Sequence, residues 1–326
     1  MDMNILEILN QLNFVALFLI FIISKLVIET YLKIRNINSI NENKETIPER
    51  FIDVITDEEY KKSINYNIER IRFSILTSVF GVGVLLFFTI GGMLNNLTLF
   101  VQGITGSNIV GAILLGLLLI VIGEIIEIPL AVYSTFYIEE KYGFNKTTTK
   151  TFVTDLFKNL LIQSIFSSIL YAIVISIIEN LGNNWWIYAF IAVFLLQLII
   201  FYIYPVLILP LFNKFEPLED EKFKAPIERL LEKISFKAKG LFVMDGSLRS
   251  SHGNAFFTGF GSNKRIVFYD TLLETITPDE MESILGHELG HYKLGHIKKT
   301  LISSIFFGFA GFYILGQVFQ SENFFY

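Results

Sequence analysis

The chain contains no cysteine and only four histidines, and charged residues make up 17% of its 326 positions. The absence of cysteine fits a reducing compartment, and it equally fits a lineage that uses little cysteine. The net charge is −5, and no basic patch interleaved with aromatic residues offsets it. This composition predicts that the chain does not bind nucleic acid.

Hydrophobic residues make up 52% of the chain, and the mean hydropathy is positive at +0.54. Such values are typical of membrane proteins. Six apolar runs are each long enough to cross a hydrocarbon core as a helix. They predict a mainly α, polytopic membrane protein, and they cover residues 12–32, 73–94, 109–134, 157–179, 185–212 and 301–320.

Basic residues predict how these spans are oriented. Lys and Arg concentrate in segments 33–72, 135–156 and 213–300, whereas segments 95–108 and 180–184 contain none. Because loops rich in Lys and Arg stay in the cytosol, the three basic segments are expected on the cytosolic side and the N-terminus outside.

Two of the four histidines belong to the motif His287-Glu288-Leu289-Gly290-His291. On a helix, His287 and His291 lie one turn apart on the same face, where both imidazoles can bind one zinc ion. Glu288 then lies beside the metal as the general base of a metalloprotease. The motif predicts one Zn²⁺ per chain, with Glu288 as the catalytic residue.

A helix over residues 278–298 is predicted by its own start signals. Thr277 is a suitable N-cap, Pro278 suits the first helical position, and Glu280 completes a capping box. Apolar residues at helical spacing predict a buried face made of Met281, Ile284, Leu285, Leu289 and Leu294. His296 would lie out of phase with His287 on this helix, so it is interpreted as a surface or helix-end residue.

Residues 213–300 form the one long polar segment and predict a small α+β zincin-like catalytic subdomain. A helix is expected over 221–237, with strands at 241–244, 254–257 and 266–269. Asn254 and Ala255 would start an edge strand that binds an extended peptide substrate, or else belong to a structural hairpin. The expected domains are residues 1–212 with about five spans, 213–300, and 301–326 with a further span.

Glu124 and Glu127 lie inside the third apolar run, before Pro129. Carboxylates within a membrane are costly and face a cavity or a partner. They would line a hydrated chamber, pair with a Lys or Arg, or serve as ion sites of a transporter. A helix break is expected at Pro129.

Three blocks resemble the CAAX prenyl protease 1 family, and together with the segments between them the resemblance covers residues 29–300. They are the run Arg249–Gly261 with its continuation to Leu273, the run His287–His296 and the run Ile138–Lys146. The resemblance implies an integral-membrane zinc metalloendopeptidase with a hydrated chamber and a cytosolic metal site. It further implies peptide or protein substrates of the membrane, CAAX-prenylated ones among them, and the bacterial plasma membrane is favoured over the endoplasmic reticulum.

The family's third zinc ligand is a glutamate that follows a further membrane span, in an E-x-x-x-D pattern. That glutamate is not present in this chain: Glu322 is the last acid, and Tyr326 stands where its aspartate partner is expected. The resemblance therefore predicts a C-terminally truncated member and leaves its activity open. The alternatives are a non-catalytic truncated pseudo-protease or a membrane transporter.

Overall fold

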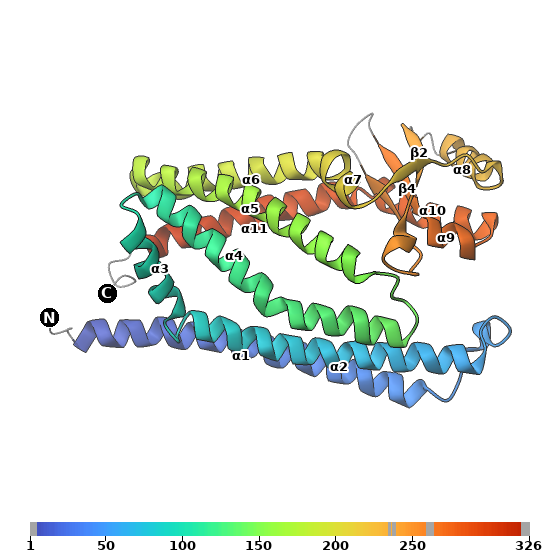
Figure 1. Ribbon diagram of the computed structural model, residues 1–326, viewed down its shortest axis with the longest axis horizontal. Coiled ribbons are helices and arrows are strands. Elements are labelled where there is room, and N and C mark those ends of the chain that lie inside the picture. The colour runs from blue at the N-terminus through green and yellow to red at the C-terminus, as the bar shows by residue number, and fades with distance from the viewer. Residues whose placement is uncertain (1–4, 234–235, 237–238, 259–263, 321–326) are drawn as a thin grey trace. The chain divides into compact units, whose positions relative to one another are not determined.

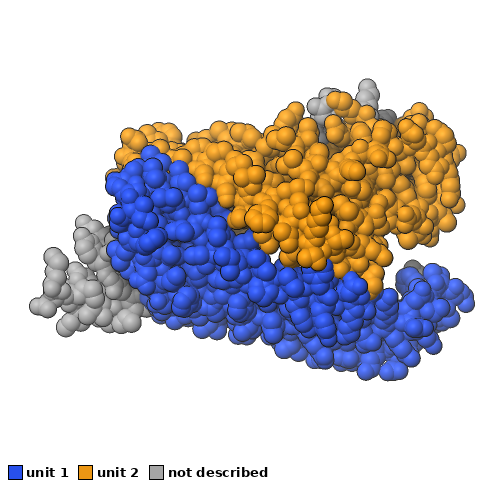
Figure 2. Space-filling model, in the orientation of Figure 1, with its two compact units in different colours: residues 1–142, 317–326 blue, residues 143–316 orange. Residues whose placement is uncertain are grey.

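The computed structural model describes residues 5–233, 236, 239–258 and 264–320. Contacts within the chain group it into two units, residues 1–142 with 317–326, and residues 143–316 (Figure 2). Among the described residues, six helical stretches are long and apolar enough to span a membrane. Their side chains are almost entirely unburied within the protein, as expected for surfaces that contact lipid. The prediction of six spans is confirmed.

The regular elements of the first unit are helices in the part of it that the structure describes (Figure 1). Lys33 lies in the first span, where its ammonium donates to the Ser78 hydroxyl at 2.8 Å and to the Ser74 carbonyl at 3.1 Å. A charge in an apolar span is satisfied in this way by the neighbouring helix. The elements of this unit are α1 Ile5–Asn43, η1 Glu49–Phe51, α2 Asp57–Phe88, α3 Met93–Ile104, α4 Asn108–Tyr133 and the π-helix η2 Ser134–Glu139.

The expected helix break at Pro129 is wrong. Pro129 lies inside α4, which continues to Tyr133 and passes directly into η2. A proline removes one backbone hydrogen bond, and a π-helical turn adds one residue to a turn of the helix, so this span changes its winding without ending. The short helix α3 was not predicted, since twelve uncharged residues are too few for a span.

The second unit combines three spans with the polar subdomain (Figure 1). Trp186 packs edge-on against Phe309 and Tyr313, which joins two of these spans. The helical elements are α5 Thr149–Asn180, η3 Gly182–Asn184, α6 Trp185–Ile203, η4 Tyr204–Ile208, α7 Leu209–Phe212, α8 Glu221–Lys233, η5 Gly246–Leu248, α9 Asp270–Thr275, α10 Pro278–Lys293 and α11 His296–Phe319.

A four-stranded sheet forms the centre of the subdomain, in the order β1-β2-β4-β3. Its strands are β1 Phe215–Pro217, β2 Gly240–Met244, β3 Ala255–Thr258 and β4 Arg265–Tyr269. The pairs β1–β2 and β3–β4 are antiparallel, and β2–β4 is parallel. Three of these strands were predicted, whereas β1 was missed because three residues give no readable alternation.

The subdomain core lies between one face of this sheet and two helices. Ile266 and Phe268 of β4 are nearly inaccessible to solvent and belong to one cluster with Ile227 of α8 and with Met281 and Leu285 of α10. Alternate residues of a strand share a face, so α8 and α10 cover the same face of the sheet. The predicted subdomain of mixed α and β structure is therefore present, and α10 is held against its sheet.

Candidate metal centre

The helix that carries the histidine motif begins as the sequence predicts. The Thr277 hydroxyl accepts a hydrogen bond from the Glu280 backbone N–H at 3.4 Å, and the Glu280 carboxylate accepts one from the Thr277 N–H at 2.7 Å. This capping box satisfies two backbone donors that a helix start leaves without partners. The backbone hydrogen bond from Thr277 holds the pKa of Glu280 below its usual value.

The two faces of α10 have different environments. Met281, Leu285 and Leu289 are buried in the subdomain core, whereas His287 and His291 are exposed on another side of the helix. Glu288 is half-buried between these two faces. Burial of the apolar face fixes the rotation of the helix, and this fixed rotation presents both imidazoles to solvent.

The two imidazoles face each other through the nitrogens that suit a shared metal. His287 Nε2 and His291 Nε2 are 3.1 Å apart. Two nitrogens that each lie about 2.0–2.1 Å from a tetrahedral zinc are roughly 3.3 Å apart. The separation of the two nitrogens is therefore close to that of two ligands of one zinc ion.

The helix ends earlier than the sequence analysis expected, and this changes the position of His296. The expected helix over 278–298 is wrong because α10 stops at Lys293 and Gly295 adopts a left-handed φ of 66°. Leu294, which was assigned to the buried face, is 62% exposed at this turn. His296 begins α11 instead, and its Nδ1 lies 2.7 Å from Nδ1 of His291. Sequence reasoning missed this contact, although Gly295 was the available signal for a helix end.

No third metal ligand accompanies the pair within residues 5–233, 236, 239–258 and 264–320: this part of the chain has no group of three His, Asp or Glu side chains that could hold a metal. Glu322, which was considered and rejected as the third ligand, lies outside the described residues.

The strand expected beside the motif is at the edge of the sheet. β3 pairs with β4 on one side, and the helix α10 contacts it. Ala255 is the first residue of β3 and is 8% exposed, and Asn254 immediately precedes it. The Asn254 carbonyl accepts a hydrogen bond from Tyr269 N–H at 2.9 Å, which extends the pairing with β4 by one residue. An edge strand has a row of backbone groups that can pair with an added peptide.

Arg249 ties the catalytic subdomain to a membrane span, and sequence reasoning did not identify it. Its guanidinium donates to both carboxylate oxygens of Asp155 in α5, at 2.7 and 3.0 Å. It also donates to the Asn213 side chain at 3.0 Å and to the Phe212 carbonyl at 2.8 Å. The Arg249 carbonyl accepts a hydrogen bond from Lys146 N–H, so both the side chain and the backbone of Arg249 are held in place. Arg249 thereby anchors the loop that leads to β3.

The two intramembrane carboxylates belong to α4 in the first unit. Glu127 is exposed and lines a largely apolar cavity of about 720 Å³ within that unit, and Glu124 is half-buried one turn earlier. A carboxylate that opens into a cavity can remain hydrated inside a membrane.

Six apolar spans, together with a sheet and a helix that presents H-E-x-x-H, define an integral-membrane metalloprotease. Residues 36–214 match the family model of the CAAX prenyl protease N-terminal region with five membrane helices, and residues 217–325 match peptidase family M48. The chain is 34% identical to CAAX prenyl protease 1 of Saccharomyces cerevisiae, over 94% of this chain and 69% of that protein. It is 36% identical to the CAAX prenyl protease 1 homolog of Arabidopsis thaliana, over 87% of this chain and 68% of that protein.

A solved structure agrees with these matches. The crystal structure of S. mikatae Ste24p superimposes with a TM-score of 0.86 at 32% identity, covering 94% of this chain and 72% of that one. The chain belongs to the CAAX prenyl protease 1 family within peptidase family M48, and it is an integral-membrane zinc metalloprotease. The transporter and pseudo-protease alternatives are not favoured by these matches.

Proposed function

We propose that this protein is an endopeptidase of membrane-associated proteins, CAAX-prenylated proteins among them. The observation that carries the proposal is the pair of Nε2 atoms 3.1 Å apart on the exposed face of α10, a helix that also contacts the edge strand β3. The relatives named CAAX prenyl protease 1 support the prenylated substrate class.

His287 and His291 would hold one Zn²⁺ per chain, and the glutamate expected as the third ligand remains a prediction that no described residue fills. When bound, the metal acidifies a water molecule and polarises the scissile carbonyl. Glu288 lies beside the pair on the same helix, where its carboxylate accepts a proton from the attacking water and donates it to the leaving amine. Because His287 and His291 face each other through Nε2, their Nδ1 atoms remain for orienting contacts, and in His291 that contact is to His296.

Asn254 and Ala255 would bind the substrate backbone. An extended peptide that pairs with β3 is recognised mainly by its main chain, which suits an enzyme that cuts sequences with different side chains. Within the first unit, Glu124 and Glu127 would line a hydrated chamber, and the cavity at Glu127 supports this role.

The decisive experiment compares Glu288→Gln with Glu282→Gln in the full-length protein. Both glutamates lie on α10, and Glu282 is exposed outside the motif. Glu288→Gln is expected to retain zinc and to lose at least about a hundredfold in kcat on a farnesylated peptide, because an amide cannot accept the proton. Glu282→Gln is expected to match the parent. Retention of near-parental turnover by Glu288→Gln would remove this residue from the mechanism.

The metal centre is proposed to face the cytosol. Substrates prenylated in the cytosol would then reach it, whereas secreted proteins would not. Single cysteines introduced into this cysteine-free chain and labelled in intact cells with an impermeant thiol reagent test the topology. The five positions are Asn41, Asn96, Asn145, Asn183 and Ser262. Labelling is expected only at Asn96 and Asn183. Labelling at Ser262 would place the metal centre outside.

The division into residues 1–212, 213–300 and 301–326 remains a proposal, supported by the junction of the two family matches between 214 and 217. The preference for a bacterial plasma membrane over the endoplasmic reticulum also remains a prediction, to which the eukaryotic relatives add no support. The absence of nucleic-acid binding also remains a prediction.

A further inference from the structure

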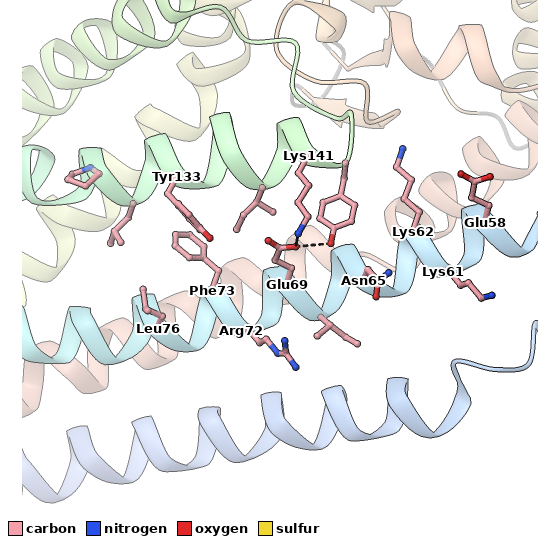
Figure 3. A pocket seen from close by; sticks show the side chains of 15 residues that line it. Glu58, Lys61, Lys62, Asn65, Glu69, Arg72, Phe73, Leu76, Tyr133 and Lys141 are labelled. Carbon is pink, nitrogen blue, oxygen red and sulfur yellow. Dashed lines mark hydrogen bonds and ion pairs between the residues drawn. The ribbon is translucent and has the colours of Figure 1, made fainter.

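A second cavity, of about 1110 Å³, lies within the first unit along one face of α2 (Figure 3). The α2 residues that line it recur at intervals of three and four, so they form one continuous stripe of the helix. The opposite wall is supplied by the end of α4, by η2 and by the two residues Lys141 and Tyr142. The cavity is therefore a groove between two helical walls. The α2 residues that line it are Glu58, Lys61, Lys62, Asn65, Ile68, Glu69, Arg72, Phe73 and Leu76.

Both walls of this groove change from polar to apolar in the same direction. In its polar half, Glu69 of α2 accepts hydrogen bonds from Lys141 at 2.6 Å and from the Tyr142 hydroxyl at 2.7 Å. In its apolar half, Phe73 of α2 packs on Tyr133 of α4, with ring centroids 5.1 Å apart. Figure 3 shows these two contacts in sequence along the groove. A ligand that fits both halves has a polar head and an apolar tail.

The charge of the polar half selects an anionic head. Four cations line the groove and two carboxylates accompany them, which leaves an excess of two positive charges (4 − 2 = 2). Glu69 is already engaged by Lys141, so the excess is carried by the remaining basic residues Lys61, Lys62 and Arg72 against Glu58.

The point along α2 at which charged residues give way to apolar ones matches a membrane surface. Residues 57–72 of α2 are rich in charge, and the apolar part of the span begins at Phe73. The polar half of the groove therefore lies at the level of lipid headgroups and the apolar half at the level of acyl chains. In the proposed topology this is the cytosolic side, whose leaflet carries the anionic lipids.

We propose that this groove binds one anionic glycerophospholipid, with its headgroup in the polar half near Lys61 and Lys62 and an acyl chain along Phe73, Leu76 and Leu130. The groove is lined by residues of the first unit, whereas the metal centre and the proposed peptide strand belong to the second unit, and nothing in the catalytic mechanism uses the groove residues. Lipid bound here would link the second span to the end of the third.

Native mass spectrometry of the full chain in an uncharged detergent tests the proposal. Phosphatidylserine, phosphatidylcholine with the same acyl chains, and glycerophosphoserine without chains are titrated separately. One phosphatidylserine is expected to bind tightly, and the other two probes weakly, because each lacks either the anionic head or the tail. Equal binding of phosphatidylcholine, or equal binding of glycerophosphoserine, would refute the proposed lipid site.

Variants locate the site. Lys61→Gln combined with Lys62→Gln is expected to weaken phosphatidylserine binding about 25-fold, since each basic residue near an anionic lipid contributes about fivefold. Leu130→Trp narrows the apolar half and is expected to weaken binding about tenfold without changing any charge. Lys44→Gln is the matched control, because Lys44 is exposed in the loop before α2 and does not line the groove.

Three further results would overturn the proposal. Equal weakening by Lys44→Gln would indicate diffuse attraction to the basic loops. Unchanged binding in both groove variants would place the lipid elsewhere. Displacement of phosphatidylserine by a farnesylated peptide, lost in the same variants, would assign the groove to substrate. None of these measurements uses peptidase activity, so their outcome is independent of the proposed function.

Discussion

Replacement of His296 by alanine is expected to weaken zinc binding without abolishing it. The His291 Nε2 faces His287, and the His291 Nδ1 lies 2.7 Å from His296. A histidine ligand needs a partner on its second nitrogen, which fixes the ring orientation and leaves the lone pair of the first nitrogen on the metal side. In this chain His296 supplies that partner for His291.

The expected size of the effect follows from this arrangement. Loss of a partner that orients a metal ligand costs about 10–100-fold in metal affinity. Loss of a ligand itself costs more, because the number of protein ligands sets the zinc affinity. The expected order of zinc affinity is therefore parent, then His296→Ala, then His287→Ala and His291→Ala at similar low values.

Competition with a chromophoric chelator measures this order in the full-length protein. His296→Gln is the informative companion, since its amide can still hydrogen-bond to the His291 ring and should restore part of the affinity. The matched control is His252→Ala, because His252 lies outside the motif and stacks on Phe144 with ring centroids 4.3 Å apart. Parental affinity in His296→Ala would refute the orienting role, and a loss equal to that of His291→Ala would make His296 a ligand.

Three further outcomes are expected from thermal unfolding of the detergent-solubilised protein. Thr277→Ala should lower the free energy of unfolding by about 0.5–2 kcal/mol, because α10 loses its N-cap, and an unchanged melting temperature would contradict this. The pKa of Glu280 is lowered in the folded protein, so its contribution to stability is present above about pH 4.5 and is lost as the pH falls through the folded value. Glu280→Gln should therefore destabilise more at pH 7 than at pH values below 4.5, and an equal effect at both would refute the cap's electrostatic role. Arg249→Met should lower the free energy of unfolding by about 2–3 kcal/mol, because it leaves Asp155 without its charged partner in a site where both side chains are less than one-third exposed. Arg229→Met is the control and should leave the free energy of unfolding unchanged, because Arg229 is exposed.

The tendency of each segment to span a membrane or to start a helix could be read from the sequence. A run of about twenty apolar residues has no soluble alternative of comparable stability, so the six spans follow from composition alone. The start of α10 follows from Thr277, Pro278 and Glu280, because the hydrogen bonds of a capping box join residues three positions apart. Strands β2, β3 and β4 were likewise recognised from local apolar runs between glycines.

Contacts between distant segments could not be read in this way. The anchoring of Arg249 by Asp155 joins residues 94 positions apart, and neither residue has a local pattern that names the other. The edge position of β3 was proposed from the sequence, but the order β1-β2-β4-β3 depends on a parallel pairing that only the folded subdomain reveals.

The metal centre shows most clearly which features follow from local sequence and which depend on contacts between distant segments. The sequence by itself determined that His287 and His291 share a helix face, since their spacing of four residues is close to one helical turn. Only the tertiary structure decided which ring nitrogens meet, and that His296 lies against His291. The physical reason is the left-handed turn at Gly295, which ends one helix, begins the next and brings together two imidazoles that a continuous helix would hold apart.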